Sequence, residues 1–249
     1  MLPSSSDREP SEPARNFRTT HWSVVLLAGQ ADLAQSAQAL EILCRTYWYP
    51  VYSFIRHKGY DVHETHDLTQ AFFARLIEKN YVEAADSEKG KFRTFLLTAV
   101  TRFLANEQDR AHALKRGGGD TALSLDEEDA EGRFLHEPIH GQAPDKLYDQ
   151  AWARQVLSVV LDRLRAEFDR AGRTNRFEEL KTFLVDDKGA LSYAEAAARL
   201  GLTPSAVKTG IHRLRQRYAQ LIREEIAQTV DDPAQVETEI QYLIDALTE

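Results

Sequence analysis

Apolar residues recur at every third or fourth position along most of the chain, and this spacing constrains the fold more than any other feature. Between 37 and 56 they form one helical face, made of Leu40, Leu43, Tyr47, Val51 and Phe54. Faces of the same spacing follow at 68–76, 92–103, 152–168 and 207–221. No segment shows sustained alternation of β-branched residues, the pattern typical of strands. The sequence therefore predicts an all-α protein.

The helical faces fall into two groups, separated by a segment rich in glycine, proline and acidic residues that begins at 117–119. Pro50 predicts a kink or a break inside the first long helix. A short helix is expected after Thr19 and Thr20, and two short helices and then a long one around Gly201. The predicted organisation is a disordered lead-in at 1–18, a helical domain at 19–116, an acidic linker at 117–144, a second helical domain at 145–226 and an acidic, helical C-terminal extension at 227–249.

Composition excludes several classes of protein. Of the 249 residues, 43% are hydrophobic and 28% are charged, a balance typical of soluble globular domains. The one cysteine, Cys44, allows neither an intramolecular disulfide nor a multi-cysteine zinc site. The first residues lack the apolar core of a secretory signal, and no run approaches the ~20 apolar residues that span a bilayer. A cytoplasmic protein without a membrane segment is expected.

The net charge of −8 argues at first against a nucleic-acid partner, but the charges are unevenly distributed. From 224 to the end there are eight acids and no Lys or Arg, so this tail accounts for the whole net charge. Segment 120–137 has seven acids and one base, whereas 199–223 has six bases and no acid, and 91–116 has six bases and two acids. Local charge decides whether a surface attracts phosphate within a Debye length of about 8–10 Å. The two basic segments make a polyanionic partner plausible.

The segment from Ser192 to Arg217 carries the strongest local pattern. Gly201 supplies a left-handed turn after a short helix, and Thr203 caps the next helix, with Pro204 at its first position. Small inner residues let two helices cross closely, as in a helix-turn-helix, whose second helix enters the major groove of DNA. The inner face is expected to hold Ala194, Ala197, Leu200, Val207, Ile211, Leu214, Tyr218 and Leu221. The alternative is a helical hairpin with a solvated basic face.

Two further helical segments have a polar face beside an apolar one. Asp67 and Gln70 share a face of the helix that buries Phe72 and Leu76, a pattern typical of any amphipathic helix. In 90–106, aromatic residues occupy one face and Arg, Thr and Asn the other, which suits a surface that binds nucleic acid by stacking and phosphate contacts. A core helix with polar residues on its outer side explains the second pattern equally well.

Two groups of histidines are weak candidates for a metal site. The segment His136-Glu-Pro-Ile-His140 has zinc-motif spacing, but that chemistry needs both histidines on one helical face, and Pro138 prevents a regular helix. His63, His66 and Asp67 match no standard ligand spacing. The sequence contains no phosphate-binding loop and no catalytic constellation. No metal, no cofactor and no enzymatic activity are expected.

Three segments, taken in order, resemble the extracytoplasmic-function (ECF) sigma factors, which are sigma-70-class subunits of bacterial RNA polymerase. They are Asp67-Leu-x-Gln-x-Phe-Phe-x-Arg-Leu76, Phe92-Arg-x-Phe-Leu96 and Ala206-Val-Lys-x-x-Ile-His-Arg-Leu-Arg215, and the resemblance covers about 37–226. It implies a sigma-2-like domain and a sigma-4-like helix-turn-helix domain joined by the acidic linker. The implied function is to direct core polymerase to specific promoters and to initiate transcription, without catalysing a reaction.

The resemblance also implies roles for the matching positions. The positions implied to bind the β′ coiled-coil of core polymerase are Asp67, Gln70 and Arg75. The positions implied to bind and melt the −10 element are Arg93, Thr94, Thr98, Arg102 and Asn106. The positions implied to bind the −35 element are Ser205, Lys208, Thr209, His212, Arg213 and Arg215. The second domain also contacts the β flap, and the linker runs toward the active centre and the RNA exit path.

Two other functions compete with this interpretation. A stand-alone helix-turn-helix regulator that binds an operator without polymerase is the main alternative, although it gives no reason for the Asp67 segment. A metal-dependent helical hydrolase rests only on the two groups of histidines. Run-off transcription with core polymerase separates the three functions.

The acidic tail has a helical apolar stripe of Val236, Ile240, Leu243 and Leu247. An isolated helix of this length is marginal in water, so the stripe is expected to dock either on its own chain or on a regulator such as an anti-sigma factor. The tail carboxylates are expected to repel phosphates and to compete for the cations of the preceding basic helix. Truncation after Gln228 is therefore expected to strengthen DNA binding, most of all at low salt.

Overall fold

Every element that the structure describes is a helix. The computed structural model describes residues 33–77, 91–113, 127–135, 141–185 and 192–248. The order is α2 (Leu33–His57), α3 (Val62–Ile77), α5 (Phe92–Ala113), α6 (Glu127–Leu135), α7 (Pro144–Arg170), α8 (Thr174–Leu180), α9 (Thr182–Val185), α10 (Tyr193–Leu200), α11 (Pro204–Ile226), the 3-10 turn η1 (Pro233–Gln235) and α12 (Val236–Thr248). The predicted all-α fold is confirmed for these residues. The lead-in at 1–18, the helix expected after Thr20 and the glycines at 117–119 lie outside them.

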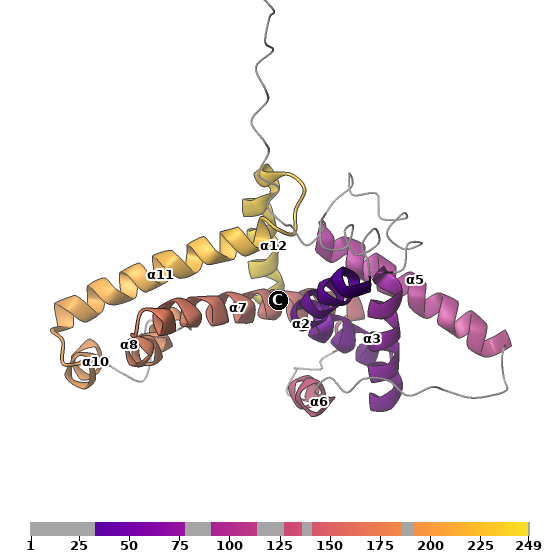
Figure 1. Ribbon diagram of the computed structural model, residues 1–249, viewed down its shortest axis with the longest axis horizontal. Coiled ribbons are helices and arrows are strands. Elements are labelled where there is room, and N and C mark those ends of the chain that lie inside the picture. The colour runs from indigo at the N-terminus through magenta and orange to yellow at the C-terminus, as the bar shows by residue number, and fades with distance from the viewer. Residues whose placement is uncertain (1–32, 78–90, 114–126, 136–140, 186–191, 249) are drawn as a thin grey trace, which may run out of the picture.

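Helix α7 forms the axis of the molecule (Figure 1). Its N-terminal half packs against α2, which in turn packs against α3. Its C-terminal half runs antiparallel to α11, with α8 and α10 at the far end of this pair. Helix α12 contacts both α7 and α11. Both halves of the chain are therefore built on one helix of 27 residues, about 40 Å long at 1.5 Å per residue.

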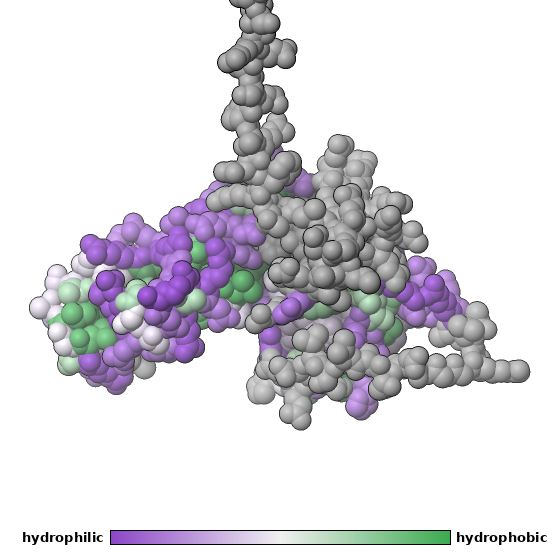
Figure 2. Space-filling model, in the orientation of Figure 1, coloured by the Kyte–Doolittle hydropathy of each residue, from purple (hydrophilic) through white to green (hydrophobic). Residues whose placement is uncertain are grey.

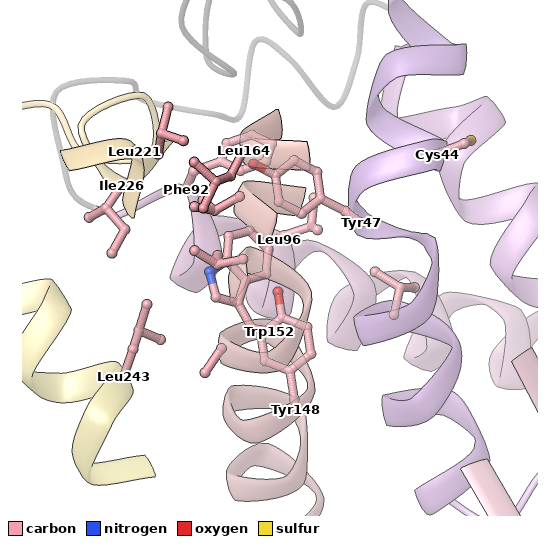
Figure 3. Close-up of a cluster of buried hydrophobic side chains, with 14 of the residues drawn as sticks. Cys44, Tyr47, Phe92, Leu96, Tyr148, Trp152, Leu164, Leu221, Ile226 and Leu243 are labelled. Atoms are coloured by element: carbon pink, nitrogen blue, oxygen red, sulfur yellow. The ribbon is translucent and has the colours of Figure 1, made fainter. Parts of the chain in front are cut away.

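An aromatic cluster joins α7 to α2 and α5 (Figure 3). Tyr47 of α2 stacks on Trp152 of α7, with ring centroids 4.5 Å apart and planes within 10°. The rings of Tyr148 and Phe92 lie 6.0 and 6.3 Å from that of Trp152. Leu243 of α12 belongs to the same buried cluster, which continues along α7 to α11. One hydrophobic core therefore crosses the domain boundary predicted at residue 144.

Two predictions of helix extent can be compared with the structure. The sequence predicts a kink or a break at Pro50, and α2 continues through this residue, so a break does not occur. Proline removes one backbone hydrogen bond, but the neighbouring Tyr47 and Val51 are buried in the core, which holds the helix on both sides. The second short helix and the long helix expected after Gly201 are a single element, the 23-residue α11.

The predicted linker contains a docked helix, α6. Its Glu131 accepts hydrogen bonds from the Tyr52 hydroxyl at 2.6 Å and from Nε and Nη2 of Arg56 at 3.0 and 2.8 Å. The Arg56 guanidinium carbon also lies 4.6 Å from the ring centre of Phe134. The hydrogen bonds from Arg56 lower the pKa of Glu131. At least this part of the acidic segment is thus fixed to α2.

Cys44, the one cysteine of the sequence, is buried on α2 in the same core (Figure 3). Burial in apolar surroundings disfavours the charged thiolate. The pKa of the thiol is raised to about 12. The side chain therefore packs as a small apolar group.

Replacing the ring at the centre of the aromatic cluster tests this core. We expect Trp152→Ala to lower the free energy of unfolding by about 3–5 kcal/mol, because it removes a fully buried ring and leaves a cavity. Leu135→Ala, which truncates a side chain that is 70% exposed, should change it by less than about 0.5 kcal/mol. Urea unfolding followed by circular dichroism measures both. Equal stability of the two variants would contradict the packing described above.

Candidate nucleic-acid interface

The turn between α10 and α11 has the local geometry that the sequence predicts. Ser192 and Glu195 form a reciprocal capping box at the start of α10. Gly201 ends that helix in the left-handed conformation, at φ 63°. Thr203 then caps α11 by accepting a hydrogen bond from the Ala206 amide, with Pro204 at the first position. These predictions are confirmed, and the two helices form a helix-turn-helix.

Helix α11 is divided into a buried and an exposed face. Val207, Ile211, Leu214 and Leu221 are buried and Tyr218 is half-buried, as predicted. In α10, however, Ala196 joins Ala197 inside, and Ala194 is exposed. Farther along α11 and α7 the surface is largely hydrophilic in the view of Figure 2. The side of α11 away from its buried face carries five of the six predicted −35 residues, all exposed: Ser205, Lys208, Thr209, His212 and Arg213.

Arg215, the sixth of these residues, is turned toward the protein. Its Nε and Nη2 donate hydrogen bonds to the carbonyl oxygen of Phe183 at 3.1 and 2.6 Å. Phe183 is buried at the end of the α8–α9 segment, which precedes the helix-turn-helix. The expectation that Arg215 faces DNA does not hold in this arrangement, because its guanidinium holds α9 against α11.

Helix α5 presents a second polar stripe. Four predicted −10 residues follow one another at four-residue spacing and are all exposed: Thr94, Thr98, Arg102 and Asn106. Positions four apart lie on one face of a helix, so these side chains form a continuous row. The other side of α5 buries Phe92, Leu96 and Phe103.

Arg93 is the exception, because its side chain is buried between three helices. Its guanidinium pairs with Asp149 of α7 and, at 3.0 Å from Nε, with Glu239 of α12. Lys91 Nζ lies 2.7 Å from the other oxygen of Glu239, and the guanidinium carbon of Arg93 lies 4.3 Å from the ring centre of Tyr242. Burial acts to lower the pKa of Arg93, but the carboxylates outweigh it and raise the pKa above its usual value. Arg93 is therefore not available to DNA here, contrary to the prediction.

The residues predicted to bind polymerase differ in exposure. Asp67 on α3 has a side chain that is 80% exposed. Gln70 is half-buried, and its amide oxygen makes no hydrogen bond within the described part of the chain. Arg75 pairs with Glu107 of α5, and its guanidinium carbon lies 5.2 Å from the ring centre of Phe103. Asp67 is thus exposed to solvent, whereas Arg75 joins α3 to α5.

A family model described as ECF sigma factor matches residues 37–225, which is more than half of the chain. This range contains all three segments analysed above. The chain belongs to the ECF sigma factor family. Sigma factors are DNA-binding proteins of transcription initiation, and the family acts with core RNA polymerase at promoters. No match was found among the curated proteins or among the solved structures.

The C-terminal helix of this sigma factor lies outside the matched range and docks on its own chain, one of the two expected outcomes. Glu239 and Tyr242, which hold Arg93 and Asp149, were not expected to have a role. A signal for Glu239 exists in the sequence, because it shares the helical face of Val236, Ile240 and Leu243. An acid inside an apolar stripe indicates a buried cation as its partner.

The histidines of the described residues, His63 and His66, are not part of a metal-binding group. Within the described residues of this sigma factor, no three His, Cys, Asp or Glu side chains come together in a way that could hold a metal ion. His63 is exposed, and His66 is buried with its ring 5.4 Å from that of Trp48. The segment 136–140 lies outside the described residues. No described helix is long and apolar enough to cross a membrane.

The role of Arg215 can be tested by comparison with Lys208. We expect Arg215→Ala to lower the free energy of unfolding by about 1–3 kcal/mol, because the buried carbonyl of Phe183 loses its donors. Lys208→Ala removes an exposed side chain and should change stability by less than about 0.5 kcal/mol. Thermal unfolding of both variants decides the matter. If neither differs from the parent protein, the hydrogen bonds from Arg215 do not hold α9 in place.

Proposed function

We propose that this sigma factor directs core RNA polymerase to specific promoters through two DNA-binding helices. One observation carries the proposal: α11 follows a capped helix-turn-helix and presents an exposed row of hydroxyl, imidazole and basic side chains. Segment 199–223, which includes that row, contains six bases and no acid. Such side chains can bind base edges in the major groove and the phosphates beside it.

Each helix takes one part of the promoter in this proposal. Helix α11 binds the −35 element through Ser205, Lys208, Thr209, His212 and Arg213. Helix α5 binds the −10 element through Thr94, Thr98, Arg102 and Asn106. Arg93 and Arg215 support these helices from inside the fold, because their guanidinium groups are engaged there.

Asp67 marks the surface proposed for core polymerase. Its carboxylate is exposed on α3, beside the half-buried Gln70, and suits a basic site on the β′ coiled-coil. The second domain would contact the β flap. The acidic linker would pass toward the active centre, where a channel that holds RNA is lined with positive charge.

Run-off transcription with core polymerase tests the proposal. With a cognate promoter template, transcripts should appear only when this protein is added to core polymerase. Asp67→Ala should weaken binding to core polymerase with an unchanged melting temperature, because the side chain is exposed. Lys208→Ala should keep the affinity for core polymerase and weaken promoter binding, by about 1–3 kcal/mol if Lys208 contacts a base.

The outcomes separate the competing functions. Sequence-specific binding of a duplex without polymerase, together with no transcript in its presence, would favour a stand-alone regulator. Normal polymerase binding by Asp67→Ala would remove the surface proposed on α3. Unchanged promoter binding by Lys208→Ala would remove the exposed face of α11.

We also propose that α12 restrains the −10 helix in the free protein. Glu239 occupies Lys91 and Arg93 at the start of α5, and Glu237 accepts a hydrogen bond from Arg223 of α11 at 2.6 Å. The tail therefore competes for cations at α5 as well as at the expected basic helix. Truncation after Gln228 would also remove a fold contact, because the Phe92 amide donates to the Thr229 carbonyl at 2.8 Å. A single substitution is the better test.

Glu239→Gln keeps the shape of the side chain and removes its charge. We expect it to loosen α12 and to strengthen binding to a −10 duplex with an unpaired region, since Lys91 and Arg93 lose a buried carboxylate. Asp245→Asn makes the same change in net charge at an exposed side chain of α12 whose hydrogen bond is with Gln241, and should bind DNA as the parent does. Fluorescence anisotropy at low and moderate salt measures both. Equal affinities of the two variants would contradict a restraint by Glu239.

A further inference from the structure

A small cavity lined by arginines lies between the α7–α8 turn and α11. Its volume is about 220 Å³, below the ~300–1,000 Å³ typical of pockets for drug-sized ligands. The residues that line it include Phe168 and four arginines, Arg173, Arg176, Arg213 and Arg217. No acidic residue lines it. The size and the charge suit one compact anionic group.

The positive charge of this cavity is only partly compensated. Glu167 accepts hydrogen bonds from Nε and Nη2 of Arg217 at 2.9 and 2.5 Å, which raises the pKa of Arg217 and lowers that of Glu167. The guanidinium groups of Arg173, Arg176 and Arg213 make no ion pair with any residue in the described ranges.

Nearby carboxylates are occupied by other bases. Glu178 lies 2.5 Å from Lys181 Nζ and 3.4 Å from Arg165 Nη2. Glu179 lies 3.5 Å from Nη1 of Arg199. The cavity thus gathers like charges that an anion would stabilise.

Gly210 gives a second, independent indication. It lies inside α11, where glycine costs roughly 0.5–1 kcal/mol relative to alanine. A Cβ at this position would lie 2.9 Å from Nη2 of Arg176 and 3.3 Å from Cδ1 of Leu180. Because position 210 has no side chain, the Arg176 guanidinium lies directly against α11. A Cβ there would make this guanidinium shift from its place in the cavity.

We propose that this arginine cavity binds a phosphate group. Guanidinium groups are suited to this ligand, because their planar donors match phosphate oxygens in pairs. Arg213 adjoins His212 on the exposed face of α11, so a DNA backbone that follows this face would bring a phosphate to the cavity. A free phosphate compound offers the same chemistry, and the experiment distinguishes the two sources. Only the DNA source rests on the function proposed above.

The experiment uses the full chain without polymerase and four variants. Arg176→Ala and Arg173→Ala each remove a cavity cation, and Gly210→Ala displaces the Arg176 guanidinium without changing the net charge. Lys58→Ala is the control, because it removes an exposed cation that is outside the cavity and outside both proposed DNA-binding helices. Circular dichroism establishes that each variant is folded. If one cavity variant fails to fold, the other two carry the test.

The first arm measures binding of a fluorescent duplex of arbitrary sequence over a salt series. Loss of one phosphate contact reduces the magnitude of the slope of log K against log salt by about 0.9, so Arg176→Ala should reduce it by that amount and Lys58→Ala should not. Gly210→Ala should weaken binding at low salt in the same direction. The second arm measures the rise in melting temperature on addition of sodium pyrophosphate at constant ionic strength.

The two arms assign the source of the phosphate. If the cavity variants change only the salt slope of DNA binding, the phosphate comes from DNA. If they lose only the rise in melting temperature caused by pyrophosphate, the phosphate comes from a free phosphate compound. Both results together show that the cavity accepts either. If the cavity variants match Lys58→Ala in both arms, the proposal is overturned. Because neither arm uses polymerase or a promoter, this failure is distinct from failure of promoter recognition.

Discussion

Arg93 connects three helices that are far apart in the sequence, and the arrangement of the two halves depends on it. Its charge lies beside Asp149 and Glu239 in an interior where an unpaired ion would cost several kcal/mol. Each partner therefore requires the other two. Removal of one partner from such a buried set typically costs about 3–5 kcal/mol, whereas the intact set adds little net stability. The network acts mainly by specifying where α12 and α5 meet α7.

This geometry couples the C-terminal helix to the rest of the sigma factor. Any partner that needs the start of α5 must displace Glu239 or bind together with it. That displacement costs free energy. The apparent affinity of the partner is therefore its affinity for molecules with α12 displaced, multiplied by the fraction of molecules in that state. The coupling is reciprocal, so a ligand that holds α12 on α7 weakens the same partner by an equal factor. The segment outside the family match thus bears directly on a helix inside it.

Local chemistry made much of this fold predictable. Gly201, Thr203 and Pro204 each act within a few residues, so the sequence indicates the turn and the start of α11. From helical spacing alone, the side chains of Arg93 and Arg215 are expected to point to solvent. Contacts with Glu239 and Phe183, which are distant in sequence, turn them into the protein instead. Helix α6 was missed for the same reason, because Glu131 finds its partners on α2. Asp67, Lys208 and His212 lie on exposed faces, as their helical spacing indicates.

The buried thiol on α2 has a consequence for oxidative stress. The thiolate is the form that reacts with peroxides and disulfides, and with a pKa of about 12 only about one molecule in 10⁵ carries it at pH 7. The side chain is also buried in the hydrophobic core. Cys44 in this arrangement is therefore a poor target for oxidants. Its oxidation would first require the core around α2 to open.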